Sequence, residues 1–178
     1  MIMKKMTIDN AHSEIGFKVK HLMISTVKGK FTTFNGGVKE DGSVSVSMNV
    51  GSINTGNMDR DHHLRGADFF NDIEFPTVNF NGKMSEDMNS ITGEVTIKGI
   101  TKEITLNTEY NGMSVDPWGN KKHGWEITGT INRNDFGLVW NAPLETGGVL
   151  VSDEVKLSMD IQMMEEVVEE EMITQSEN

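Results

Sequence analysis

Apolar and polar residues alternate with a period of two along most of this chain. Ile15, Phe17 and Val19, for example, are each separated by a glycine or a lysine. Successive side chains of a strand point to opposite faces, so such runs predict strands with one apolar and one solvated face. The runs lie at residues 15–21, 44–50, 78–80, 95–97, 104–110, 125–131 and 155–163; residues 27–38 form another with a bend or bulge near 32–33, and residues 21–25 read as a turn.

Short polar connections separate these predicted strands. The pairs Asp41-Gly42, Asn81-Gly82 and Asn111-Gly112 tolerate positive φ and are typical of hairpin turns. About eight antiparallel strands of this kind must bury their apolar faces in either a sandwich or a closed barrel. An eight-stranded barrel has an interior just wide enough to be filled by side chains or to hold one small ligand.

Composition narrows the class of protein. The chain has 178 residues, 36% of them hydrophobic, no cysteine and a formal net charge of -11. This length suits one domain, and the lack of cysteine excludes disulfides, thiolate catalysis and Cys-ligated zinc. The negative charge argues against a nucleic-acid partner, and no run approaches the ~20 apolar residues that span a bilayer. We therefore expect a globular all-β protein that is not integral to a membrane.

The charge is unevenly spread along the chain. Residues 165–178 hold six of the 27 acids and no lysine or arginine, so 21 acids and 16 bases leave the remainder at -5. This like-charged run predicts a solvated, mobile tail, and a docked terminal helix is the alternative. Residues 1–9 lack the apolar stretch of a secretory leader. That predicts a cytoplasmic protein, or a periplasmic one if a leader has been removed.

Few residues suggest catalysis or metal binding. His62 and His63 fall in a predicted short helix over residues 58–66, which Asn57 or Asp59 would cap. Adjacent helical residues do not converge on one ion, so we expect capping and salt bridging there and no metal. His21 lies on the apolar phase of its strand, either as a hydrogen-bonded core residue or as a polar group in a ligand cavity. The chain contains no GxSxG elbow and no carboxylate pair that stands out, so no catalytic residue is predicted.

Several large aromatic residues fall outside the predicted strands. Apolar loop residues need a place to pack, and in a barrel they either plug its ends or line the mouth of a cavity. They are Phe69, Phe70, Phe75, Trp118, Phe136 and Trp140.

Short motifs also occur along the chain in a fixed order. They are IDNAHSEIGF (8–17), VKHLM (19–23), VKGKF (27–31), SINTG (52–56), RDHHL (60–64), DFF (68–70), FP (75–76) with Phe80, KGITK (98–102), DPWG (116–119), NRNDFG (132–137), WN (140–141) and ETGGVLVSDEV (145–155). Each motif alone is weak evidence. As an ordered set, from about residue 8 to residue 163, they resemble the YceI-like family of lipid- and polyisoprenoid-binding proteins.

This resemblance implies an antiparallel, eight-stranded, lipocalin-like β-barrel with a short helix. Residues 8–164 would form it, residues 1–7 an N-terminal extension and residues 165–178 the acidic tail. It also implies binding of a long-chain isoprenoid, such as a quinone tail or a polyprenyl phosphate, or a similar amphiphile, with no cofactor, metal or catalytic residue and a possible homodimer. The expected cavity lining is Phe17, Val19, His21, Phe31, Phe34, Val46, Met48, Phe70, Phe80, Ile97, Leu106, Tyr110, Trp125, Ile131, Phe136, Trp140 and Ile161.

Two other functions stay open at this point. An enzyme acting on a small apolar substrate at the barrel mouth would require a water-accessible polar cluster with perturbed titrating groups. A stress or interaction protein would act through the acidic residues 165–178. The resemblance to a bacterial lipid-binding family favours a third function, that of a carrier, store or sensor of lipid. His21 and Tyr110 would then be polar groups at the mouth of the cavity.

Overall fold

The computed structural model describes residues 3–145 and 148–167. Within these ranges antiparallel strands dominate, joined by one α-helix and short 3-10 helices. The strands are β1 (Met6–Ile8), β2 (Glu14–His21), β3 (Ser25–Phe31), β4 (Phe34–Val38), β5 (Ser43–Asn49), β6 (Ile53–Asn54), β7 (Thr77–Met84), β8 (Ser90–Ile97), β9 (Ile100–Val115), β10 (Lys121–Asn132) and β11 (Val151–Glu165). The helices are η1 (Asn10–His12), η2 (Val50–Ser52), α1 (Met58–Arg65) and η3 (Arg133–Phe136).

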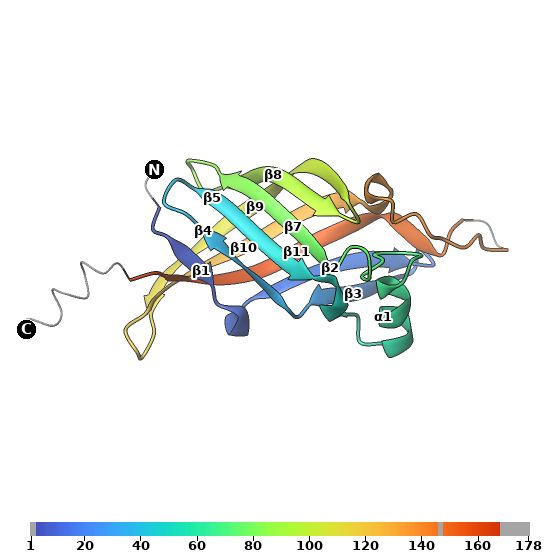
Figure 1. Ribbon diagram of the computed structural model, residues 1–178, viewed down its shortest axis with the longest axis horizontal. Helices are drawn as coiled ribbons and strands as arrows, with labels where there is room; N and C mark the ends of the chain where they lie inside the picture. Colours follow the sequence, from blue (N-terminus) through green and yellow to red (C-terminus); the bar gives the residue numbers. More distant parts are fainter. Residues whose placement is uncertain (1–2, 146–147, 168–178) are drawn as a thin grey trace, which may run out of the picture.

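Eight of the strands close into a barrel. Hydrogen bonds join them in the order β1-β4-β5-β7-β8-β9-β10-β11, and β11 pairs in turn with β1. The closed barrel is therefore confirmed and the sandwich is excluded. The strands are steeply tilted, which gives an elongated barrel whose apolar faces surround a single interior (Figure 1).

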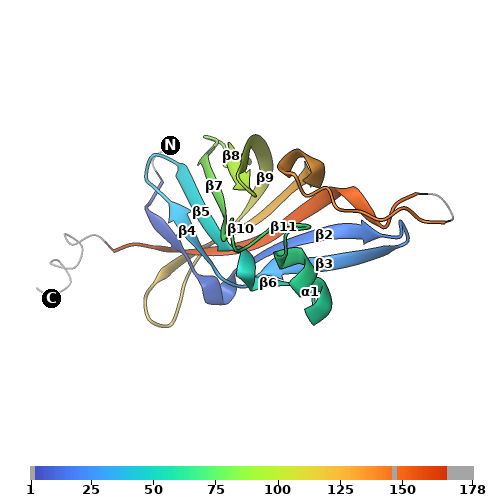
Figure 2. The same cartoon turned by 45° about the vertical axis from the view of Figure 1, so that its right-hand side comes forward.

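Three further strands extend one end of this barrel. β2 pairs with the first part of β11, β3 pairs with β2, and β6 pairs with β3. The bend expected near residues 32–33 is confirmed and separates β3 from β4, so one chain segment serves both the extension and the barrel. Helix α1 lies beside β6 and β3 here (Figures 1 and 2). We call this the α1 end, and the opposite end, where β1 meets the last residues of β11, the β1 end.

Helix α1 forms where the sequence predicts it. Asn57 is the cap, because its side-chain oxygen accepts a hydrogen bond from the Arg60 N–H at 2.9 Å. The buried Asp61 carboxylate accepts from both the backbone N–H and the hydroxyl of Thr55, at 2.8 and 2.6 Å. These bonds fix the start of the helix against β6.

Of the three predicted glycine turns, only Asp41-Gly42 is confirmed; it joins β4 to β5 with Gly42 at φ 84°. Asn81-Gly82 instead lies within β7, opposite Gly93, where a Cβ on Gly82 would come 2.8 Å from the Thr92 carbonyl oxygen. Asn111-Gly112 lies within β9, where the register with β10 shifts and Gly112 has φ 106°. Glycine serves close strand approach and bulges as well as turns, so the pair alone does not define a hairpin.

The domain boundaries differ from those predicted. Residues 3–7 of the predicted extension belong to the barrel, because Met3 and Met6 are buried in the core and Met6 pairs with both Val38 and Glu165. Glu165 closes β11, and Glu166 accepts hydrogen bonds from Lys5 and Thr7 at 2.8 and 2.9 Å. The barrel therefore begins before residue 8 and continues past residue 164. The predicted tail beyond residue 167 lies outside the described residues.

A charged pair ties the start of the chain to β10. The ammonium group of Lys122 donates to the Asp9 carboxylate, which also lies 3.0 Å from His12 Nδ1. The hydrogen bond from Lys122 lowers the pKa of Asp9, His12 adds to the effect, and partial burial opposes it. A carboxyl group whose folded pKa is depressed stabilises the fold above its unfolded pKa of 3.8, and this contribution is lost as pH falls through the folded pKa.

Asp9→Asn is therefore expected to lower the free energy of unfolding by about 2 kcal/mol near pH 7 and by almost nothing near pH 2. Urea unfolding at both pH values measures the difference. Glu14→Gln, which removes an exposed carboxylate 3.5 Å from Lys30, is the control and should change little at either pH. Equal destabilisation by Asp9→Asn at both pH values would show that the charge is not involved.

Candidate functional site

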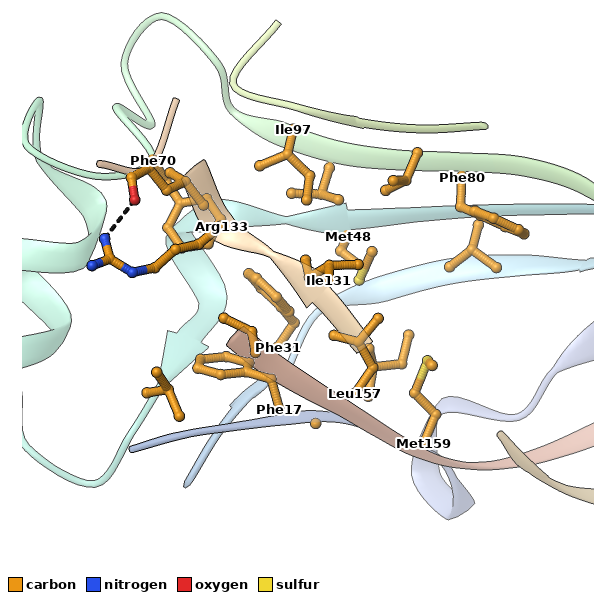
Figure 3. Close-up of a pocket in the computed structure, with 18 of the residues that line it drawn as sticks. Phe17, Phe31, Met48, Phe70, Phe80, Ile97, Ile131, Arg133, Leu157 and Met159 are labelled. Carbon is orange, nitrogen blue, oxygen red and sulfur yellow. Dashed lines mark hydrogen bonds between the residues drawn. The ribbon is translucent and has the colours of Figure 1, made fainter. Parts of the chain in front are cut away.

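The barrel encloses one cavity of about 540 Å³. This volume falls within the range of known small-molecule sites. Every strand of the closed barrel contributes to its wall, and Figure 3 shows apolar side chains converging on the space from facing strands. The alternation of apolar residues in the sequence is the cause, since each strand turns its apolar face inward.

Most of the predicted lining residues surround this cavity. The structure brings together Phe17, Val19, His21, Phe31, Val46, Met48, Phe70, Phe80, Ile97, Leu106, Trp125, Ile131, Trp140 and Ile161.

Three predicted lining residues lie outside the cavity wall. Phe34 sits opposite Met48 on the inward face but packs into the core without facing open space. Phe136 is buried in η3, beyond the strand that carries the wall. Tyr110 lies opposite Trp125 toward the β1 end, where the two rings pack at 4.9 Å, and its hydroxyl bonds His123 Nδ1 at 2.7 Å. Its predicted role as a polar group at the mouth is therefore wrong.

The middle of the cavity is open space. Val46, Met48, Ile131, Leu157 and Met159 point inward yet are only half-buried, because part of each side chain faces the cavity. A fully packed core would bury such residues completely. Both ends are more tightly packed than the middle.

At the α1 end, aromatic rings narrow the cavity. The ring of Trp140 lies 4.7 Å from that of His63 and 5.4 Å from that of Phe69, while Phe70 packs edge-on against Phe31 at 6.1 Å. Three of the loop aromatics, Phe69, Phe70 and Trp140, thus line the mouth of the cavity, as the sequence suggests. Trp118 is 84% exposed and neither lines the mouth nor plugs the barrel.

Polar groups collect at the same end. The Arg60 guanidinium donates to the Thr55 hydroxyl at 2.7 Å and to the Thr55 carbonyl at 2.8 Å. His63 Nε2 lies 2.9 Å from the Asp68 carboxylate, which confirms the expected salt-bridging role for this histidine. Lys20, His21, Thr55, Asp59, Arg60 and His63 all belong to this end of the lining.

Arg133 is the most buried charge at the cavity wall, with 4% of its side chain exposed. Its guanidinium donates to four backbone carbonyls, those of Leu138, Trp140, Val151 and Ser152. Figure 3 shows the group at one end of the apolar side chains. Burial lowers the pKa of Arg133 from its ordinary value, and the Asp153 carboxylate 3.8 Å away partly offsets this. Arg133 therefore holds residues 138–140 and 151–152 against the cavity.

The polar residues of the α1 end were not predicted as part of the site. Arg133 appears in the sequence only as part of the NRNDFG motif, and its sole signal is its position before Phe136, Leu138 and Trp140. Arg60 and His63 lie on a helix whose inward face carries no periodic apolar pattern. Only the folded chain brings these groups to one end of the cavity.

One donor in the wall has no partner within residues 3–145 and 148–167. The indole N–H of Trp125, a residue only 1% exposed, is buried without a hydrogen bond. An unpaired buried donor is costly, and this nitrogen is itself closed off from the open cavity. In the same described ranges, no cluster of three or more His, Asp or Glu side chains has the geometry to hold a metal ion.

A closed barrel around a largely apolar cavity, polar at one end, defines a binding protein for apolar or amphiphilic molecules. A sequence model of the YceI-like domain matches residues 6–163, and the chain belongs to this family. A UPF0312 protein of Staphylococcus aureus (strain N315) is 42% identical over 161 residues, which cover 86% of this chain and 94% of the relative.

Solved structures share the fold. The YceI protein of Campylobacter jejuni is 32% identical, with a TM-score of 0.70 over 89% of this chain and 96% of that one. BcnA of Burkholderia cenocepacia has a TM-score of 0.73 at 21% identity, over 87% and 98% of the two chains. A polyisoprenoid-binding domain from Saccharophagus degradans has a TM-score of 0.74 at 12% identity, over 92% and 100%. The last two similarities concern the fold alone.

No helix in the described part of the chain combines the length and apolar character needed to cross a bilayer.

Proposed function

We propose that this protein binds a long-chain isoprenoid, or a lipid of similar shape, inside the barrel. The cavity carries this proposal, because apolar side chains from every barrel strand face open space. Its polar residues collect at the α1 end, which suits an amphiphile with one polar group. The fold shared with a polyisoprenoid-binding domain supplies a precedent.

The energetics favour a hydrocarbon chain. Each buried CH₂ contributes ~0.8 kcal/mol, so each five-carbon isoprene unit gains roughly 3–4 kcal/mol before costs. Ordering the chain and extracting it from other lipid offset much of this gain. A wall of Phe17, Met48, Phe80 and Met159 can adapt to methyl branches, since methionine fills irregular gaps. The walls therefore provide affinity without charged anchors.

The ligand has a preferred orientation in this proposal. Its polar group lies at the α1 end near Arg60 and His63, and its chain extends past Leu157 toward the β1 end. Trp125, with its unpaired N–H, lies on the same strand as Ile131 but toward the β1 end. Trp125, Ile161 and Met163 line the cavity at this depth, which suits the hydrocarbon end of the ligand.

A fluorescence titration tests the ligand class. Delipidated protein is titrated with an isoprenoid alcohol and with a straight-chain saturated alcohol of equal carbon number. We expect quenching or a spectral shift with both, and about tenfold tighter binding of the isoprenoid, equivalent to about 1.4 kcal/mol. Trp118→Phe, which removes an exposed indole, should keep the full response, whereas Trp125→Phe should lose part of it and Trp140, also in the lining, should supply the rest. Equal binding of the two alcohols would reject isoprenoid selectivity.

A further inference from the structure

The tip of the β2–β3 hairpin exposes apolar side chains. Leu22, Met23 and Ile24 are 36%, 62% and 83% exposed. They form one consecutive run at the end of a hairpin that projects at the α1 end, away from the hairpin joining β9 to β10 (Figures 1 and 2). We call these three residues the apolar tip. A contiguous exposed apolar group marks a contact surface more often than a scattered one does.

The backbone of the apolar tip runs against local preference. Leu22 and Met23 have φ of 53° and 61°, in the left-handed region that turns of this kind usually fill with Asn and Gly. Large residues adopt it at a cost, and the side chain of Met23, 62% exposed, gains little packing within the chain in return. Residues that break a local rule without internal compensation point to a role outside the fold.

Lysines surround this hairpin. Residues 15–33 contain four lysines and neither aspartate nor glutamate, in a chain of net charge -11. On the outer face, Lys156 of β11 lies opposite Lys18 of β2, which lies opposite Lys28 of β3. Like charges directly opposite each other destabilise a sheet. Of the acids nearby on β11, Asp153 already faces Arg133 at 3.8 Å. The lysine row Lys156, Lys18 and Lys28 therefore suits an anionic partner.

The apolar tip is also joined to the cavity. The Leu22 N–H donates to the Leu150 carbonyl at 2.9 Å, and Lys20, His21 and Leu150 belong to the cavity lining. A molecule that left a surface in contact with the tip would therefore reach the polar end of the cavity directly. At the other end of β11, Glu165 and Glu166 are paired with His123 and Lys5.

We propose that the apolar tip and the lysine row dock the protein on a bilayer containing anionic phospholipid, with the α1 end of the cavity facing the membrane. This inference rests on the proposed function, since it names the source or destination of the bound lipid. Apolar side chains enter the interface while lysines contact anionic headgroups. A second copy of the chain fits less well, because two lysine rows brought together would repel each other.

Flotation with vesicles tests the docking. We expect the full chain to bind vesicles of phosphatidylcholine with a quarter phosphatidylglycerol, and to bind pure phosphatidylcholine at least tenfold more weakly. Met23→Ser with Ile24→Ser should reduce binding about tenfold, and Lys18→Gln with Lys28→Gln about twenty-five-fold, at about fivefold per lysine. Met113→Ser with Val115→Ser, at residues 52% and 55% exposed near the tip of the β9–β10 hairpin, is the matched control and should bind like wild type.

Three results would overturn the docking: no binding to anionic vesicles, equal binding of the Met23/Ile24 variant and wild type, or a dimer in solution that this variant dissociates. Lipid content of each variant, measured by mass spectrometry, separates this test from that of the proposed function. A variant that loses vesicle binding but keeps its lipid is impaired in docking alone. A wild-type protein without bound lipid would contradict the proposed function of the cavity.

Discussion

Leu157→Trp is expected to abolish lipid retention while leaving the barrel folded. Leu157 projects from β11 into the open middle of the cavity and is only half-buried. An indole at this position occupies the space through which a lipid chain must pass. Because it fills empty volume and does not displace packed atoms, we expect the free energy of unfolding to change by less than about 1.5 kcal/mol. Lipid bound per chain, measured after solvent extraction, should fall at least tenfold.

Ser158→Trp is the matched control for this substitution. Ser158 is the next residue of the same strand, but it is exposed and points to the outer face. The same indole placed there should leave lipid content unchanged. Equal lipid content in the Leu157 variant and wild type would show that the ligand does not occupy the middle of the barrel.

Arg133→Met is expected to give the largest loss of stability, about 3–5 kcal/mol in the free energy of unfolding. The guanidinium donates to four backbone carbonyls, of which that of Leu138 is buried and the other three are partly buried, and it faces Asp153; methionine can replace none of these bonds. Buried acceptors left without a partner each cost about 1–3 kcal/mol, less whatever water recovers. Urea unfolding measures the loss.

A conservative variant separates hydrogen bonding from charge. Arg133→Lys keeps a positive charge near Asp153 but cannot reach four carbonyls with one ammonium group. It should therefore recover only part of the lost stability. Full recovery by lysine would contradict the account, because charge alone would then hold residues 138–140 and 151–152. A loss below about 1 kcal/mol in Arg133→Met would contradict it as well.

The period-two pattern predicted the barrel and most of its wall because a single apolar face forces the register of each strand. Phe17, Val46 and Ile161 point inward as their phases indicate. The sequence could not decide between a barrel and a sandwich, since both bury one face of each strand. The family motifs favoured the barrel, and the pairing of β1 with both β4 and β11 confirms it.

The failures have local physical causes. Gly82 serves a close strand approach and Gly112 an irregularity in β9, so neither marks the hairpin that its Asn-Gly pair suggests. Tyr110 packs against Trp125 and His123 toward the β1 end, so it does not line the cavity. The polar end of the site depends on contacts between α1, residues 138–140 and 151–152, and β2, which lie far apart in sequence. No period or motif encodes such a meeting of distant segments.

Native mass spectrometry of the full chain, purified without organic solvent, tests the central claim most directly. The cavity account predicts a species heavier than the 19.8 kDa chain by the mass of a lipid. That excess should disappear on denaturation and be absent from Leu157→Trp. A wild-type protein observed only at the mass of its own chain, and indistinguishable in this respect from Leu157→Trp, would contradict the account.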